Sequence, residues 1–480
     1  MDRTHRAIAG QLRKGYTMKK STKRGLIFVF AVVLAWIACR SAGAAQIARR
    51  METSADADEW IRVFLGEEPE VLTGAWEMTP QMEAAVAALG GLKGMAASLA
   101  QLGDVKEIGS AYEGELQGYK VFFVPCVFSA MPVDLVLATQ DGAIAGLSTG
   151  AYSGGKEKTE ETEETERQAD FDSIELSLPV PSLDGGLPGT LTLPKGEGPF
   201  PAVILVHGSG PNDRDETVGS VKPFRDLAEG LAEKGIAVYR YDKRTYVFGE
   251  QMKADREITL EEETIEDAVN AAALLCAQEK IDPERIFILG HSLGGNAIPA
   301  VAEQLEQEKA GPVRACGFIL MAASPRPLDV LMREQYDFLY SLQPEVTKEQ
   351  QAEKDSIFRE LDKLKDLDAL AEDETILGIC PPYWKWLEQY DILSAAEKIT
   401  RPCLLLQGEE DYQVTMEDFS LWKEALGEKD NWKMISYPGL THCFTAGQKT
   451  EGSAVYARPE KMNGQVIEDI AAFVNSSAMQ

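Results

Sequence analysis

The sequence has few of the residues from which metal sites and covalent cross-links are built. It contains four histidines and seven cysteines in 480 residues, and no two cysteines stand in a C-x-x-C spacing. Structural zinc sites take four such ligands at short spacings, so we expect no bound metal. No motif requires an organic cofactor. Several cysteines lie inside apolar runs, which favours buried free thiols, although an exported protein could still pair some of them.

Positive charge is scarce after residue 50. The first 50 residues hold eleven Lys and Arg and one Asp, whereas the rest of the chain holds 37 Lys and Arg against 76 Asp and Glu. A body this acidic repels nucleic acid and anionic membrane surfaces at a distance. We therefore expect neither of them as a partner.

The sequence also lacks an apolar run long enough to span a membrane. Its longest run covers residues 26–38, and a spanning helix needs about 20 apolar residues. A Lys/Arg cluster precedes this run and the small residues 42–44 follow it, which is the pattern of a cleavable signal. We assign 1–44 as a targeting segment and expect export, secreted or bound to the cell envelope, with no membrane span after cleavage. Because Trp36 stands where a lipoprotein signal has a small aliphatic residue, we favour secretion over lipid anchoring at Cys39.

Two regions with different patterns follow the targeting segment. Apolar residues recur three and four apart from about 55 to 102, and strand-like runs follow as far as 150. This predicts a small α+β domain over 51–150. Residues 151–170 are polar and charged without an apolar period, which is typical of a linker.

The remaining residues, 171–480, predict a larger α/β domain. After an expected antiparallel hairpin, short apolar runs alternate with amphipathic helices, which indicates a mostly parallel, doubly wound sheet. A helical stretch from about 326 to 398 interrupts the alternation. We expect it to form a lid over the carboxyl ends of the strands, where sheets of this kind bind ligands.

The stretch ILGHSLGGNA places Ser292 between a predicted strand and a predicted helix. Gly290 and Gly294 have no side chains, so strand and helix can approach closely while the serine is held in a strained turn. Such a nucleophile elbow presents the hydroxyl to the cleft and directs the Leu293 N–H at negative charge developing on a carbonyl oxygen. The alternative is a plain glycine-rich turn.

A serine hydroxyl needs a base within hydrogen-bond reach. Among the four histidines, His5 lies in the targeting segment, His207 ends an early strand, and His291 neighbours the serine and is expected to point away from it. His442, just after the last predicted strand, is the candidate base.

The imidazole in turn needs a carboxylate that fixes its tautomer and stabilises its protonated form. The turn in LLLQGEEDYQV offers Glu409, Glu410 and Asp411, and we favour Asp411 while the two glutamates stay open. The order of serine, carboxylate and histidine is that of α/β-hydrolases.

Other residues have two interpretations each. The Ser209 N–H, in the loop HGSGPNDRDE, is the candidate second oxyanion donor, followed by Gly208. The aromatic cluster of Tyr383, Trp384 and Trp386 either roofs an apolar substrate pocket or forms the core of the lid. The charged stretches NDRDE and RYDKRT either orient a polar substrate group or form ion pairs that brace their loops, and we favour the ion pairs.

Together these motifs resemble a known family. VHGSGPNDRDE, RYDKRT, GHSLGG, GEEDYQV and THCF occur in the order found in serine hydrolases of the α/β-hydrolase superfamily, and the first two are similar to the EstD-type branch of bacterial carboxylesterases. The resemblance covers about residues 171–478. The residues before the linker resemble the small uncharacterised domain that often precedes such hydrolases.

The resemblance implies an α/β-hydrolase fold and a role for each site residue. Ser292 is the implied nucleophile, His442 the general base and then acid, Asp411 its orienting partner, and the main-chain amides of Ser209 and Leu293 the oxyanion hole.

We therefore expect an exported serine hydrolase that cleaves a small-molecule carboxylic ester through an acyl-enzyme. Two alternatives stay open: a peptidase or acyl-thioester hydrolase that uses the same triad, and a surface binding protein in which the hydrolase fold is only a scaffold.

Overall fold

The structure is a computed structural model that describes residues 48–66, 68–88, 90–97, 99, 102–116, 119–129, 132–150, 170–181, 183, 185–306, 313–343, 346–371 and 374–477. The predicted targeting segment, Cys39 and nearly all of the predicted linker lie outside these ranges. Within them, no helix is long and apolar enough to cross a membrane. The six cysteines in the described part of the chain are free.

The residues before the charged stretch form a five-stranded antiparallel sheet with three short α-helices. The central strands β3, β4 and β5 pair in chain order, and both β1 and β2 pair with β3. Trp60, Phe64 and Phe122 lie in a core of their own. The elements are α1 (Ser54–Phe64), η1 (Pro69–Leu72), α2 (Pro80–Ala88), α3 (Leu92–Ala97), β1 (Val105–Ile108), β2 (Tyr112–Leu116), β3 (Tyr119–Phe128), β4 (Pro132–Gln140) and β5 (Ala143–Gly150).

The residues after it form an eight-stranded sheet in the order β13-β12-β11-β10-β8-β9-β7-β6. The six strands from β13 to β9 are parallel, and the antiparallel hairpin of β6 and β7 extends one edge, as predicted. Four of the parallel strands, β8, β9, β11 and β12, are buried along nearly their whole length, and β10 is buried from Ile286 onward, because helices cover both faces. The strands are β6 (Phe171–Glu175), β7 (Gly189–Pro194), β8 (Phe200–Val206), β9 (Ala237–Tyr241), β10 (Ile281–His291), β11 (Gly317–Met321), β12 (Cys403–Gly408) and β13 (Trp432–Tyr437).

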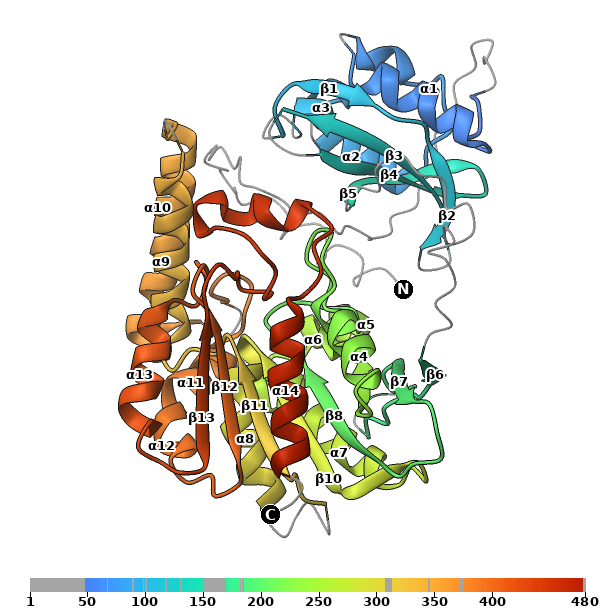
Figure 1. Cartoon of the computed structure of the whole chain (residues 1–480). Coiled ribbons are helices and arrows are strands. Elements are labelled where there is room, and N and C mark those ends of the chain that lie inside the picture. The colour runs from blue at the N-terminus through green and yellow to red at the C-terminus, as the bar shows by residue number, and fades with distance from the viewer. Residues whose placement is uncertain are drawn as a thin grey trace, which may run out of the picture. The chain divides into compact units, whose positions relative to one another are not determined.

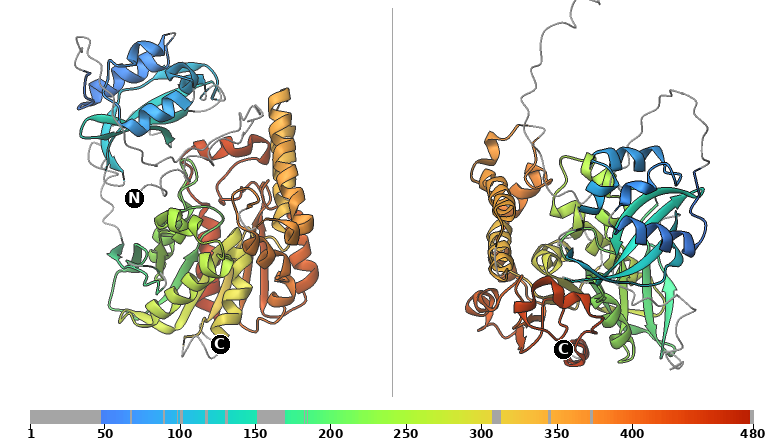
Figure 2. Two further views of the ribbon diagram at one scale, coloured as in Figure 1. Left: turned by 180° about the vertical axis from the view of Figure 1, so that it is seen from behind. Right: turned by 90° about the horizontal axis from the view of Figure 1, so that it is seen from above.

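Helices cover the two faces of this sheet in separate groups. Figure 1 shows α4 and α14 in front of the sheet, and Figure 2, viewed from behind, shows the other face with α7 and α8. Leu227 of α4 and Ile470 of α14 share one core cluster, whereas Ile298 of α8 and Trp422 of α13 share another. The helices are α4 (Pro223–Ala232), α5 (Arg244–Val247), α6 (Gly249–Ala254), the π-helical turn η3 (Glu261–Ile265), α7 (Glu266–Cys276), α8 (Leu293–Glu306), α13 (Met416–Leu426), η6 (Lys449–Ala457) and α14 (Gly464–Ser477).

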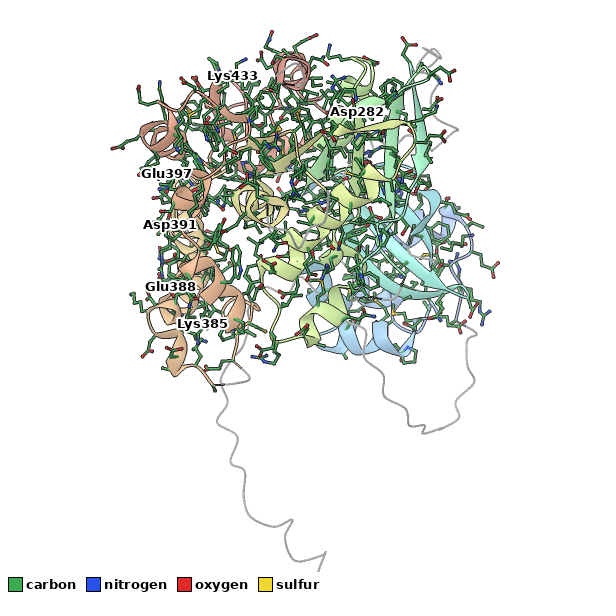
Figure 3. The ribbon with its side chains drawn as sticks, turned by 90° about the horizontal axis from the view of Figure 1, so that it is seen from below. Asp282, Lys385, Glu388, Asp391, Glu397 and Lys433 are labelled. Atoms are coloured by element: carbon green, nitrogen blue, oxygen red, sulfur yellow. The ribbon has the colours of Figure 1, made fainter. Side chains whose placement is uncertain are left out.

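The predicted interruption between β11 and β12 is helical. It consists of α9 (Leu328–Ser341), α10 (Lys348–Asp362), η5 (Lys363–Ala369), α11 (Pro381–Gln389) and α12 (Ile392–Ala396), and Figure 1 shows α9 and α10 side by side. Leu361, Ile376 and Trp384 form a small core within this lid. Its charged side chains face outward: Figure 3 shows Glu388 and Asp391 along one side of the molecule, and both are exposed.

The strand order places a crevice between β8 and β10. The chain leaves β8 toward β9 on one side and returns to form β10 on the other side of β8. The loops that follow β8 and β10 therefore diverge, and ligands of doubly wound sheets bind at such a point. The predicted elbow follows β10, and the loop that carries Ser209 follows β8.

Two glycines allow β8, β10 and α8 to approach each other. A Cβ atom added to Gly294 would overlap the carbonyl oxygen of Val206 and lie 2.6 Å from that of His207, and one added to Gly290 would lie 2.6 Å from the nitrogen of Gly295. All of these contacts are with backbone, which cannot move aside independently of the sheet. The glycines are therefore required by packing at the crevice.

We expect Gly294→Ala to lower the free energy of unfolding by about 1 to 3 kcal/mol, because the added methyl group forces α8 away from β8. Gly464→Ala, in open space at the start of α14, is the matched control and should change it by less than about 1 kcal/mol. Chemical denaturation measures both. Equal effects of the two substitutions would contradict the packing argument.

Candidate active site

Ser292 occupies a strained turn between β10 and α8. Its φ is +53°, in the left-handed region that residues with a side chain rarely adopt, and its N–H donates to the carbonyl oxygen of Met321 over 2.9 Å. Strain of this kind persists only where the surrounding structure fixes it. The side chain is partly exposed. The strand, turn and helix around Ser292 have the geometry of a nucleophile elbow.

His442 and Asp411 form a buried pair on the loops after β13 and β12. The imidazole Nδ1 lies 2.6 Å from Asp411 Oδ2, and the two residues are only 5% and 2% exposed. With the Nδ1 proton directed at the carboxylate, Nε2 keeps its lone pair and can accept a proton. The structure thus brings together the predicted base and its predicted partner.

Asp411, and neither of the two neighbouring glutamates, is the carboxylate that pairs with His442. Its Oδ1 accepts the N–H groups of Gln413 and Val414, and the side-chain amide of Gln407 donates to Oδ2. Every contact comes from a donor, which suits an ionised carboxylate. The two neighbouring glutamates are engaged elsewhere: Glu409 accepts from the Ser436 hydroxyl and Glu410 from the Lys449 N–H.

The elbow and the His442 loop are in direct contact. The ring of His291 lies 4.7 Å from the ring of His442, and its Nε2 donates to the main-chain carbonyl of His442 over 3.0 Å. The hydroxyl of Ser292 and Nε2 of His442 have no hydrogen-bond partner in the described part of the chain. Neither atom is therefore held by a competing hydrogen bond, and catalytic hydrogen bonds often tighten only when substrate binds.

Glu216 is a site residue that the sequence analysis missed. It is buried, has a φ of +51°, accepts the N–H of Gly208 over 2.6 Å, and lies 2.8 Å from Nδ1 of His291. Burial alone would lower the pKa of His291, but the charge and hydrogen bond of Glu216, together with the His442 carbonyl and the charge of Asp411, raise this pKa above 6.5. Burial would likewise raise the pKa of Glu216, but His291, His207 and the Gly208 N–H together hold it below 4.5. This second pair joins the loop after β8 to the elbow, and nothing in NDRDE distinguishes Glu216 from its acidic neighbours.

The two other histidines in the described ranges are not candidates for the base. His291 is held by Glu216 and by the His442 carbonyl, as described above. His207 is buried with its Nε2 3.0 Å from the carbonyl of Asp213, and burial lowers its pKa to about 4. Among the histidines that the structure describes, His442 is therefore the one whose Nε2 remains available.

The N–H groups of the two predicted oxyanion donors differ from that of Gly208, the residue considered next. Among the described residues, the N–H groups of Ser209 and Leu293 have no partner. The N–H of Gly208 is occupied by Glu216. A Cβ atom added to Gly208 would lie 3.1 Å from Cβ of Ser292, so this loop borders the predicted nucleophile.

The predicted aromatic pocket residues have other contacts. Tyr383 is buried and its hydroxyl donates to Glu263, and the indole N–H of Trp384 donates to the carbonyl of Ile376 in the core of the lid. Trp386 is partly buried and stacks on Tyr390. Trp384 is thus accounted for as lid core, which was the alternative interpretation.

The charged stretches NDRDE and RYDKRT pair with each other, as the bracing interpretation expects. Arg214 donates to both oxygens of Asp242, and Arg240 pairs with Asp215. A cavity of about 590 Å³ lies over these ion pairs and strands β6 and β7, and none of the predicted catalytic residues lines it. We therefore assign the ion pairs to bracing of the loop after β8.

This fold and site define a serine hydrolase of the α/β-hydrolase class. A family model described as serine aminopeptidase, S33, matches residues 199–448. A relative, Esterase EstD of Thermotoga maritima, is 36% identical over 379 residues, which cover 78% of this chain and 84% of the relative. The chain belongs to this α/β-hydrolase family. The matched length exceeds the stretch from residue 171 to the end, so the similarity extends into the N-terminal region.

Solved structures match this chain at low identity and low TM-score. Est1E of Butyrivibrio proteoclasticus matches with a TM-score of 0.40 and 16% identity, covering 64% of this chain and 99% of that chain. A puromycin-hydrolysing peptidase of Mycobacterium tuberculosis matches with a TM-score of 0.42 and 17% identity, covering 75% of this chain and 46% of that chain.

We expect Asp411→Asn to slow the reaction of Ser292 with a fluorophosphonate by about 10² to 10⁴-fold, because the amide no longer fixes the imidazole tautomer. Glu409→Gln, two residues away, is the matched control and should leave the rate within about 2-fold. Labelling time courses measure both rates. Similar losses in the two variants would contradict the assignment of Asp411.

The Glu216–His291 pair predicts a pH-dependent part of the unfolding free energy. The pKa of His291 is raised on folding. Its contribution to the free energy of unfolding is therefore fully present below about pH 6.5 and is lost as pH rises through the folded pKa. The pKa of Glu216 is lowered on folding. Its contribution to the free energy of unfolding is therefore fully present above about pH 4.5 and is lost as pH falls through the folded pKa.

We therefore expect the wild type to exceed the Glu216→Gln/His291→Gln variant in unfolding free energy most strongly between about pH 4.5 and 6.5. The difference should shrink on either side, by at most about 1.4 kcal/mol per pH unit. Denaturation curves across this range measure it. A difference that stays constant from about pH 6 to 9 would rule out the charged pair.

Proposed function

We propose that this protein hydrolyses carboxylic esters through an acyl-enzyme on Ser292. The observation that carries the proposal is the buried Asp411–His442 pair, whose free Nε2 belongs to a loop in contact with the strained turn of Ser292. The 36% identity with an esterase over most of the chain supports the ester as substrate class. A small-molecule ester is the expected partner.

In the proposed mechanism, His442 acts first as a general base and then as a general acid. His442 Nε2 takes the hydroxyl proton of Ser292 as the oxygen attacks the ester carbonyl, and Asp411 stabilises the resulting imidazolium. The N–H groups of Ser209 and Leu293 stabilise the oxyanion of the tetrahedral intermediate. His442 then protonates the departing alcohol, and a water activated by the same imidazole releases the acid from Ser292.

A peptidase that uses the same triad is the second candidate. The family model that matches this chain is described as a serine aminopeptidase. The same nucleophile attacks esters and amides, but an amide has the poorer leaving group. We favour the ester because the match to an esterase covers 78% of this chain, whereas the family model covers only residues 199–448.

We further propose that the protein is exported. The Lys/Arg cluster, the apolar run 26–38 and the small residues 42–44 support a cleaved signal. The two domains, 51–150 and 171–480, joined by the linker 151–170, remain the expected organisation. A role as a binding protein alone is disfavoured, because such a protein has no need for the buried Asp411–His442 pair.

The wild type should hydrolyse nitrophenyl esters faster than aminoacyl amides or acyl thioesters, and Ser292→Ala should lower ester turnover by at least about 10³-fold. A series of acyl lengths, followed by nitrophenolate release, measures acyl preference in the same experiment. Ser420→Ala, at an exposed serine on α13, is the control and should retain turnover. Turnover that persists in Ser292→Ala, or faster turnover of amides, would contradict the proposed function.

A further inference from the structure

Lys243 is a buried charged residue that the catalytic mechanism does not use. It belongs to RYDKRT, directly after β9, and is only 1% exposed. Its ammonium donates to the carbonyl oxygen of Gly208 over 2.8 Å and lies 2.9 Å from Oε1 of Glu263. A buried ammonium is costly unless it is paired and hydrogen-bonded, so this contact is a strong constraint on the Gly208 carbonyl.

That carbonyl belongs to the same peptide unit as the Ser209 N–H. The peptide is trans, so its C=O and N–H point in opposite directions. Lys243 holds the carbonyl on the buried side, whereas Ser209 is exposed. The Ser209 N–H is therefore turned away from Lys243, on a loop whose Gly208 lies against Ser292.

Side chains also hold the next two carbonyls of this loop, those of Ser209 and Gly210. The two N–H groups of the Asn212 side-chain amide are shared among the carbonyls of Gly208, Ser209 and Gly210, which lie 3.2 to 3.3 Å from its nitrogen. The Thr245 hydroxyl donates to the carbonyl of Gly210. Because these donors hold the carbonyl groups of the loop, its free N–H groups point away from the donors. Backbone N–H groups that are aligned in this way form an anion-binding concavity.

The partner of Lys243 connects this arrangement to the lid. Glu263 lies in the π-helical turn η3, and its second oxygen accepts the hydroxyl of Tyr383 on α11. Such turns are frequent at functional sites because they re-aim side chains. The ammonium is thus fixed by a carboxylate that is itself fixed by the lid.

We propose that Lys243 is a positioning residue that presets the oxyanion hole by holding the peptide between Gly208 and Ser209. This inference rests on the proposed function. A preorganised N–H needs no reorientation when charge develops on the carbonyl oxygen. The contact therefore lowers the free energy of the transition state and leaves that of the bound substrate unchanged. The ammonium also polarises the peptide, which strengthens the Ser209 N–H as a donor.

The test is the double variant Lys243→Met/Glu263→Gln, which removes both charges and leaves no unpaired carboxylate. Losing one oxyanion donor costs about 10² to 10³-fold in kcat, and a donor that is present but no longer held should cost about 10 to 10²-fold, with KM within about 2-fold. The inhibition constant of a boronic acid, which forms a tetrahedral adduct with the serine, should rise by the same factor as kcat/KM falls.

The matched control is Arg244→Gln/Asp267→Asn. It removes the adjacent buried ion pair, which joins α5 to α7 and, in the described part of the chain, makes no hydrogen bond to the loop after β8. Thermal unfolding of both double variants measures the structural cost. The control should lose stability while kcat and the boronate constant stay within about 2-fold of wild type.

An unchanged kcat and boronate constant in Lys243→Met/Glu263→Gln would overturn the inference, as would an equal loss in the control. Should that variant not fold, Tyr383→Phe replaces it, since loss of one hydroxyl loosens Glu263 without removing a charge. It should lower kcat by about 2 to 5-fold at constant KM, and no change there would overturn the inference. A wild type that hydrolyses no ester would instead overturn the proposed function.

Discussion

The close approach of β8, β10 and α8 is the constraint on which the site depends. A side chain at Gly294 would overlap the backbone of β8, so the elbow can form only where the helix begins directly against that strand. The approach brings Ser292 next to Gly208, because β8 and β10 pair in parallel with Gly290 opposite Val206. Nucleophile and oxyanion loop are thus placed by strand order and not by the loops themselves.

Two buried carboxylates then hold the site together, each through a histidine. Asp411 orients His442, the residue that moves protons, whereas Glu216 holds His291 and the Gly208 N–H. The two imidazole rings lie 4.7 Å apart, so the catalytic pair rests on the structural one. In a buried setting, satisfied polar pairs of this kind fix one arrangement, since breaking either leaves an unpaired charge.

The sequence was informative where local pattern and chemistry coincide. The strand, glycine and helix pattern around Ser292 identified the elbow, and the shortage of histidines left His442 as the base. The sequence favoured Asp411 over Glu409 but did not decide between them. The side chains of three adjacent acidic residues point in different directions, and these directions depend on the backbone bends after β12. Glu216 and Lys243 were missed as site residues, since their partners lie in other segments. A lysine directly after a buried strand was the available signal for Lys243.

The most direct test of the central claim is titration with a nitrophenyl dialkyl phosphate, followed by peptide mapping. If Ser292 is the nucleophile, each chain releases one nitrophenolate, the phosphoryl group is found on the peptide that carries Ser292, and ester turnover falls in proportion to labelling. A label on another residue, or ester turnover that persists in fully labelled protein, would contradict the account.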